Sequence, residues 1–147
     1  MMITPQSESE SIHPLARFVT PEAIALLLKI KVEQIKDIRC WKHVILVVAQ
    51  GLTRFVSYAD LPPIIDAEPP KTSDIARWRR RWNKNETKQA PDFWLEFYKQ
   101  KFWQAVSIAQ LYTWGQLLRI IKCLLSQTAL ESLRNEYLKA QQLLQHS

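Results

Sequence analysis

The feature that most constrains the fold is a dense run of aromatic residues in the second half of the chain. Six of the eleven positions from 93 to 103 are Phe, Trp or Tyr. The apolar positions then advance by three or four residues, the helical period, along Trp94, Tyr98, Phe102, Ala105, Ala109 and Tyr112. We therefore expect a helix that begins at residues 91–92 and continues through the apolar residues 117–125. Its aromatic side chains are expected to form a core or a dimer interface rather than a small-molecule pocket.

A second apolar seam follows near the end of the sequence. Ser126 is expected to break the first helix, and Thr128 and Glu131 have the spacing of a capping box that starts a new one. The apolar positions of this new helix are spaced three and four apart: Leu130, Leu133, Tyr137, Ala140 and Leu144. Two apolar surfaces on so small a chain indicate an association site. We expect residues 92–147 to form a homodimer through Phe93, Trp94, Phe97, Leu130, Leu133, Tyr137 and Leu144.

The first half opens with signals for helices. Residues 1–14 are polar and are expected to form a disordered tail. Thr20 can cap a helix, and Pro21 suits its first position because the proline φ is already helical. Apolar residues spaced three apart, from Val32 towards Trp41, predict a second helix.

Signals for strands follow these helices. Residues 44–48 and 54–56 are rich in β-branched and aromatic residues, and Gln50 and Gly51 between them can form a turn. This pattern predicts a β-hairpin. Ser57 is expected to cap a last short turn before the prolines at 62 and 63.

Three stretches of the first half combine into one larger pattern: residues 19–28, residues 30–35 and residues 55–61. Together, residues 19–61 resemble the winged helix-turn-helix of the excisionase and MerR-type DNA-binding families. In this resemblance the first stretch corresponds to the first helix, and the second corresponds to the turn and the start of the recognition helix. The third corresponds to the closing segment after the wing. The resemblance covers 43 of the 147 residues.

The resemblance implies that double-stranded DNA is the partner. Lys31, Gln34, Lys36 and Arg39 would then project from the second helix into the major groove, where Gln suits adenine and Lys suits guanine or phosphate. Arg54, near the hairpin turn, would reach a phosphate or the minor groove. The alternative is an ordinary helix-turn-helix or hairpin that is packed for stability, with these charges simply solvated.

Most of the excess positive charge lies in one short segment. The chain has a net charge of +6, and residues 71–90 hold seven Lys or Arg against two Asp or Glu. Thr72 or Ser73 is expected to cap a short helix in this segment, from Asp74 to about Trp82. The arginines Arg77, Arg79, Arg80 and Arg81 are expected to contact phosphates, and the neighbouring tryptophans can stack on bases or face the core. Two alternatives remain open. In the first, the segment binds an acidic protein or membrane surface. In the second, Trp78 and Trp82 dock the segment onto the domain, and the arginines keep it soluble.

The sequence offers no catalytic or cofactor-binding pattern. The three histidines are scattered, and only two glycines are present, which are too few for a glycine-rich phosphate loop. Cys40 and His43 form at most half of a metal site, so we expect neither a metal nor another cofactor. No apolar run is long enough to span a membrane, and the two cysteines show no pairing pattern. We expect a cytoplasmic protein that is not an enzyme and has no small-molecule ligand that the sequence identifies.

These observations predict a mainly α fold with one β-hairpin. Residues 1–14 form the tail, 15–66 a winged helix-turn-helix-like domain, 67–91 a linker with the basic Arg/Trp segment, and 92–147 the helical dimerisation region. The expected function is that of a MerR-like DNA-binding transcriptional regulator without a separate effector domain. The alternative is a non-enzymatic, α-helical adaptor that binds another protein through a Trp-rich surface.

Overall fold

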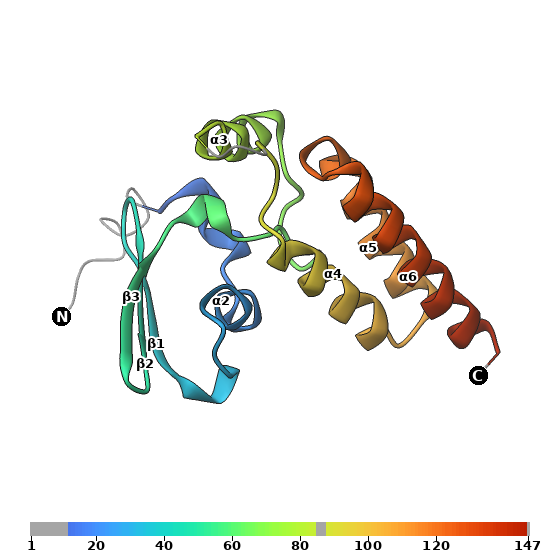
Figure 1. Ribbon diagram of the computed structural model, residues 1–147, viewed down its shortest axis with the longest axis horizontal. Helices are drawn as coiled ribbons and strands as arrows, with labels where there is room; N and C mark the ends of the chain where they lie inside the picture. The colour runs from blue at the N-terminus through green and yellow to red at the C-terminus, as the bar shows by residue number, and fades with distance from the viewer. Residues whose placement is uncertain (1–11, 85–87, 147) are drawn as a thin grey trace. The chain divides into compact units, whose positions relative to one another are not determined.

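The computed structural model describes residues 12–84 and 88–146, and it is mainly α-helical (Figure 1). In these residues, five α-helices accompany a three-stranded antiparallel sheet near the N-terminus. The chain divides into two compact units, one that ends at Leu61 and one that begins at Pro62. The predicted mainly α fold is therefore confirmed, and the predicted single hairpin is part of a larger sheet.

The first unit begins with two short helical segments. Of the predicted tail, residues 1–11 lie outside the described residues. His13 already caps the 3₁₀ helix Pro14–Phe18 and stacks on Tyr58, with 4.3 Å between the ring centroids. Helix α2, Pro21–Leu28, starts as predicted, because the Thr20 hydroxyl accepts a hydrogen bond from the Ala23 N–H at 3.1 Å.

The second helix predicted from Val32 towards Trp41 is wrong. Val32–Gln34 forms one 3₁₀ turn, and Ile35–Cys40 is strand β1. The strand pairs with β2, Ile45–Ala49, and its register shifts between Ile35 and Asp37. This bulge places Ile35 opposite Ala49 and Ile38 opposite Val47, so two residues three apart lie on one face of a strand. The three-residue spacing that suggested a helix is thus the mark of a bulged strand.

The remainder of the first unit follows the sequence signals. Strand β3, Leu52–Val56, pairs with β2 across the Gln50–Gly51 turn, so the predicted hairpin is confirmed. Gly51 has a φ of +71°, which suits glycine. Ser57 caps the short turn Tyr58–Asp60 as expected, accepting from the Ala59 N–H at 3.3 Å. The strand order is β1-β2-β3, and the buried faces of β2 and α2 supply the core of the unit.

The second unit consists of four α-helices. They are α3 (Thr72–Trp82), α4 (Phe93–Gln104), α5 (Ile108–Ile121) and α6 (Gln127–Gln145). The predicted helix at the basic segment is confirmed. Its expected cap, Thr72 or Ser73, is wrong, because Lys71 takes that position and its N–H donates to the Asp74 carboxylate at 2.9 Å.

The single long helix predicted from residue 93 to residue 125 is also wrong. It divides at Ala105, where the backbone becomes extended, and Ser107 caps α5 by accepting from the Gln110 N–H at 3.1 Å. The apolar stripe continues across the break, so hydrophobic period alone does not reveal it. The cap of α6 is Ser126 rather than Thr128, since the Ser126 hydroxyl accepts from the Ala129 N–H at 3.0 Å.

A cluster of indole rings joins α3 to α4. Trp94 makes edge-to-face contacts with Trp78 and Trp82, with ring centroids 5.7 and 5.0 Å apart. All three rings are buried, and Trp94 also meets the edge of Tyr98 at 6.5 Å. The Tyr98 hydroxyl donates to the Pro63 carbonyl at 2.8 Å. Trp78 and Trp82 are one helical turn apart, so their burial fixes the rotation of α3 about its axis.

Trp94→Ala is expected to lower the free energy of unfolding of the second unit by about 3–5 kcal/mol, because it removes a fully buried indole. Trp103→Ala is the matched control, since this indole lies on the same helix and is 47% exposed. It is expected to cost about 1 kcal/mol. Urea unfolding followed by far-UV circular dichroism measures both changes, and equal losses would contradict the central role of Trp94.

Candidate functional site

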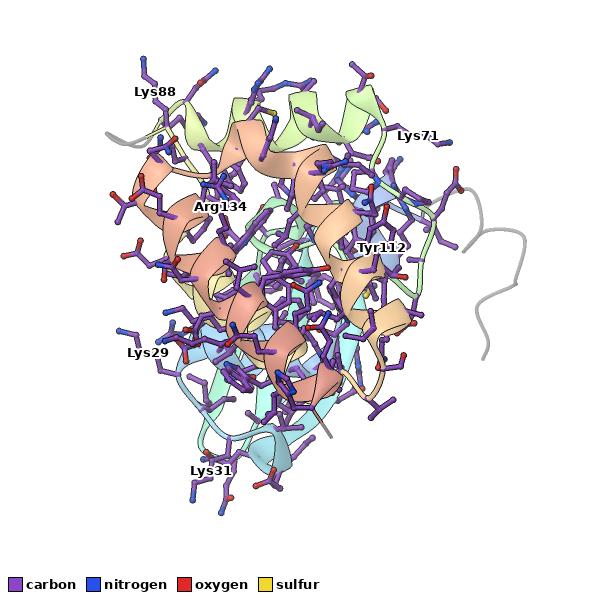
Figure 2. The ribbon with its side chains drawn as sticks, turned by 90° about the vertical axis from the view of Figure 1, so that its right-hand side faces the viewer. Lys29, Lys31, Lys71, Lys88, Tyr112 and Arg134 are labelled. Atoms are coloured by element: carbon purple, nitrogen blue, oxygen red, sulfur yellow. The ribbon has the colours of Figure 1, made fainter. Side chains whose placement is uncertain are left out.

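Helix α3 presents a basic surface on the side opposite its tryptophans. Arg79, Arg80 and Arg81 are exposed, and Figure 2 shows Lys71 and Lys88 extending outward near the two ends of the helix. We call these five residues the α3 basic face. Successive residues of a helix point about 100° apart, so the three arginines spread over the side of α3 that the two buried tryptophans leave in solvent.

The fourth arginine predicted in this segment has a different environment. Arg77 is partly buried, and its Nη1 lies 3.4 Å from Oδ1 of the buried Asp74. Asp74 also accepts from the Lys71 N–H, so the carboxylate caps α3 and balances Arg77 within the fold. Arg77 is therefore committed to an internal ion pair. Arg79 and Arg80, in contrast, form no ion pair with any of the residues that the structure describes.

Of the two possibilities for the tryptophans, stacking on bases or facing the core, the structure confirms the second. Trp78 and Trp82 are almost completely buried against Trp94. A base cannot stack on an indole that is already covered on both faces. The α3 basic face can therefore offer guanidinium and ammonium groups to an anion, but no aromatic platform.

The DNA-contacting residues predicted in the first unit do not form one surface. Lys31 and Gln34 belong to the 3₁₀ turn, where the Gln34 side chain accepts from the Lys31 N–H at 2.9 Å. Lys36 and Arg39 lie on β1, and Arg39 is paired with Asp37 at 2.7 Å. Because these positions are not on a helix, the predicted projection of Lys31, Gln34, Lys36 and Arg39 from a recognition helix is wrong.

Arg54 lies on the other side of the sheet from Arg39. Arg39 pairs with Leu46 of β2, and Leu46 pairs with Phe55 of β3, so these three residues form one row across the sheet. Arg54 belongs to the next row, where it pairs with Val47. Side chains of successive residues alternate between the two faces of a sheet, so these neighbouring rows point to opposite sides. The two arginines cannot contact the same stretch of a ligand across one face.

The face of the sheet that contains Arg39 also carries an exposed aromatic pair that the sequence patterns did not single out. Phe55 and Trp41 contact each other at 5.7 Å between ring centroids and are 62% and 46% exposed. Strand β3 shows no alternation of polar and apolar residues that would have signalled this exposure; Phe55 lies on the face opposite to that of the buried Val56 because successive residues of a strand alternate between faces. We call Trp41 and Phe55 the sheet aromatic pair.

Cys40, next to this pair, has no feature of an activated thiol. Burial raises the pKa of Cys40, and a hydrogen bond from Tyr58 opposes this effect only in part. The pKa of Tyr58 is itself raised by burial and by the neighbouring Cys40. A thiol with a raised pKa is mostly protonated at neutral pH and is a poor nucleophile.

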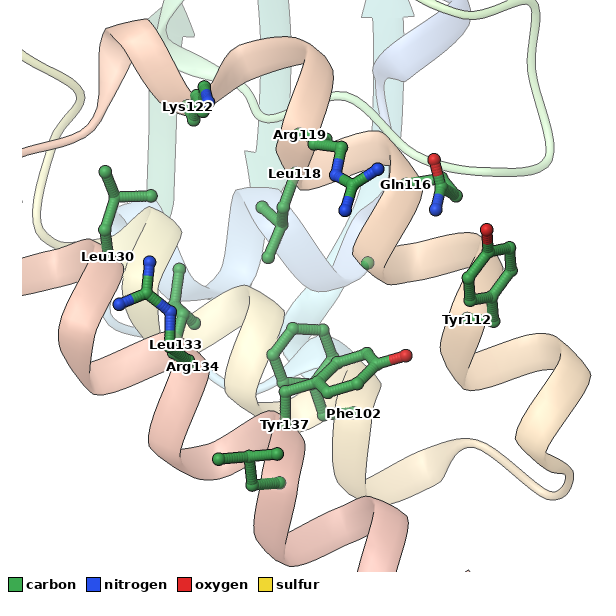
Figure 3. A pocket seen from close by; sticks show the side chains of 12 residues that line it. Phe102, Tyr112, Gln116, Leu118, Arg119, Lys122, Leu130, Leu133, Arg134 and Tyr137 are labelled. Carbon is green, nitrogen blue, oxygen red and sulfur yellow. The ribbon is translucent and has the colours of Figure 1, made fainter.

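A groove runs between α5 and α6, with Phe102 of α4 in its floor (Figure 3). Its volume is about 450 Å³. It is lined by Phe102, Tyr112, Gly115, Gln116, Leu118, Arg119, Lys122, Leu130, Leu133, Arg134, Tyr137 and Leu138. We call this feature the α5–α6 groove.

Gly115 allows the two walls of the groove to approach each other. A Cβ atom at this position would lie 2.9 Å from Cε2 of Tyr137, closer than real Cβ contacts allow. Tyr137 also packs edge-on against Phe102 at 5.4 Å between ring centroids. Burial raises the pKa of Tyr137, and the neighbouring Tyr112 adds to this effect. The phenol therefore stays neutral at physiological pH.

Three of the seven predicted dimer-interface residues are core residues of the single chain. Trp94, Phe97 and Leu133 are buried, which excludes them from a surface between two copies. Leu130 and Tyr137 line the α5–α6 groove, and Phe93 and Leu144 are partly buried. The apolar seam of α6 packs mainly against α4 and α5. Trp94, Phe97 and Leu133 therefore belong to the core rather than to an interface. Homodimerisation, with Phe93, Leu130, Tyr137 and Leu144 as its remaining interface residues, stays a prediction.

The described part of the chain contains no group of three or more His, Cys, Asp or Glu that could hold a metal ion. None of its helices is long and apolar enough to cross a membrane. Protein-family models, characterised proteins and solved structures give no match to this chain. The evidence for function is therefore the surfaces themselves.

Gly115→Ala is expected to lower the free energy of unfolding by about 1 kcal/mol. Alanine favours a helix over glycine by about 1 kcal/mol, but overpacking against Tyr137 costs about 1–3 kcal/mol. In a Tyr137→Ala background the obstacle is absent, so Gly115→Ala is expected to stabilise by up to about 1 kcal/mol. A double-mutant cycle by urea unfolding measures the coupling. The same sign in both backgrounds would show that Tyr137 does not limit this position.

Proposed function

We propose that this chain binds nucleic acid, with double-stranded DNA as the partner, through the α3 basic face. The observation that carries the proposal is the rotation of α3, whose buried tryptophans leave Arg79, Arg80 and Arg81 together in solvent. Three guanidinium groups in consecutive positions suit bidentate contacts with phosphate oxygens. The net charge of +6 supports an anionic partner.

The geometry favours binding to the phosphate backbone over the recognition of bases. The indoles that would stack on bases are buried, and β1 stands where a recognition helix was expected. Phosphate contacts position a protein on DNA but carry no direct sequence information. The proposed binding is thus independent of sequence and sensitive to salt. A role in regulating transcription would need base contacts in addition, which the described helices do not offer.

A second candidate is the binding of another protein through the first unit. The adaptor alternative placed its Trp-rich surface on residues that are mostly buried, but the sheet aromatic pair is exposed. Large aromatic side chains with one open face are common anchors in protein interfaces. The sheet aromatic pair supports this candidate independently of α3.

The nucleic-acid proposal predicts the salt dependence of binding. For a duplex DNA of arbitrary sequence, log affinity is expected to fall linearly with log salt, with a slope of about −0.9 for each phosphate neutralised. Arg79→Gln with Arg80→Gln removes two contacts and is expected to flatten the slope by about 2. Fluorescence anisotropy of a labelled duplex over a salt series measures the slope.

Lys42→Gln with Lys139→Gln is the matched control, because it removes the same charge from exposed positions that are not part of α3. The slope measured for this variant is expected to differ from the wild-type slope by less than about 0.5. Two duplexes of unrelated sequence are expected to bind with similar affinity. Equal slopes for the arginine variant and for the wild type would contradict the proposal.

A further inference from the structure

The α5–α6 groove separates positive charge from apolar surface along its length. Arg119 and Lys122 lie at the C-terminal end of α5 and in the turn that follows it, and Arg134 lies on α6. Figure 3 shows Arg119 extending from α5, and Arg134 from α6, into the space between the two helices. Tyr112 and Tyr137 stand toward the other end of the same groove.

The three cations have no acidic counterpart in the groove. None of the residues that line it is Asp or Glu. Arg119, Lys122 and Arg134 form no ion pair with the residues that the structure describes. Like charges held near one another on two packed helices repel, so an anion placed between them is stabilised.

The remainder of the groove is apolar. Phe102, Leu118 and Leu133 form a buried floor, and Leu138 extends this surface but is itself exposed. An apolar body lying on this floor would cover the exposed surfaces of Leu138 and Tyr112 and remove them from water, at a gain of about 25 cal/mol for each Å² covered.

From this arrangement we propose that the α5–α6 groove binds a small anionic amphiphile, a molecule with one carboxylate or phosphate head and an alkyl or aromatic body. The head lies between Arg119 and Arg134, and the body lies over Leu118 and Leu133 towards Tyr112. Arg119 and Tyr112 are seven positions apart on α5, so the body has about 10 Å of groove to occupy.

The observations favour a small molecule over a partner helix. The volume of about 450 Å³ lies in the range of small-molecule sites, about 300–1,000 Å³. The cations are confined to one end of the groove, which matches a single head group. An amphipathic partner helix would instead carry acidic residues along its whole length, and the half of the groove near Tyr112 has no cation to meet them.

Octanoate is the probe, and 1-octanol is its uncharged analogue. Titration into the ¹⁵N-labelled full chain is expected to shift the amide signals of groove residues, Gly115 among them. Octanoate is expected to bind at least about tenfold more tightly than octanol, because octanol offers no charge to the arginines. Equal affinities, or shifts spread evenly over the chain, would overturn the proposal.

Two groove variants separate the head from the body. Arg119→Gln with Arg134→Gln is expected to weaken octanoate about tenfold and to leave octanol unchanged. Gln116→Trp fills the groove from the wall of α5 and is expected to weaken both ligands. Lys42→Gln with Lys139→Gln is the matched charge control and is expected to bind as the wild type does. Thermal melts and circular dichroism establish that each variant is folded.

Two further arms test other occupants. Vesicles of anionic phosphatidylglycerol that bind the chain when octanoate does not would overturn the proposal in favour of a lipid surface. Duplex DNA that displaces octanoate from the groove would assign these cations to nucleic acid instead. The Arg79→Gln, Arg80→Gln variant is expected to retain octanoate binding in full. Failure of the nucleic-acid proposal would appear in the DNA titrations, and failure of the groove proposal would appear in the octanoate titrations, so the two failures can be told apart.

Discussion

The burial of Trp94 against Trp78 and Trp82 is the interaction on which the second unit and its α3 basic face depend. Edge-to-face contacts of 5.0 and 5.7 Å attach α3 to α4 and fix its rotation. Without that fixed rotation, four arginines within five residues would be a set of charges with no common direction. With it, Asp74 and Arg77 turn inward, and Arg79, Arg80 and Arg81 face solvent together. The hydrophobic core thereby decides which charges a ligand can meet.

The α5–α6 groove has a related origin. The chain breaks at residues 105–107, so α5 can turn back and pack beside α4 and α6 rather than extend away from them. Gly115 then lets Tyr137 lie close against α5, and the cations at the C-terminal end of α5 line the same groove as the arginine of α6. Aromatic residues that looked like a dimer interface in the sequence form the core that supports this groove. An apolar seam in a small chain is thus explained by packing within the chain before it indicates a partner.

The first unit shows how one sequence pattern can fit two structures. Val32, Ile35 and Ile38 have helical spacing, yet all three are β-branched, which favours strands. The bulge in β1 resolves the conflict, since an extra residue between Ile35 and Asp37 keeps both isoleucines on the buried side of the sheet. The resemblance to a winged helix-turn-helix depended on that segment being a helix. The hairpin and the closing turn that supported the same resemblance are present, but they close a three-stranded sheet.

By itself, the sequence determined the features that depend on neighbours within a few residues. These are the cap and proline of α2, the Gln50–Gly51 turn, the Ser57 turn, and the helical character of the basic and C-terminal segments. Only the tertiary structure decided whether residues 35–40 form a helix or a strand, because that choice depends on a register with β2. It also decided which side of α3 faces solvent and that Arg119 and Arg134 line one groove, because these depend on contacts between helices. Local physics sets the elements, and long-range packing sets which of their faces remain for a ligand.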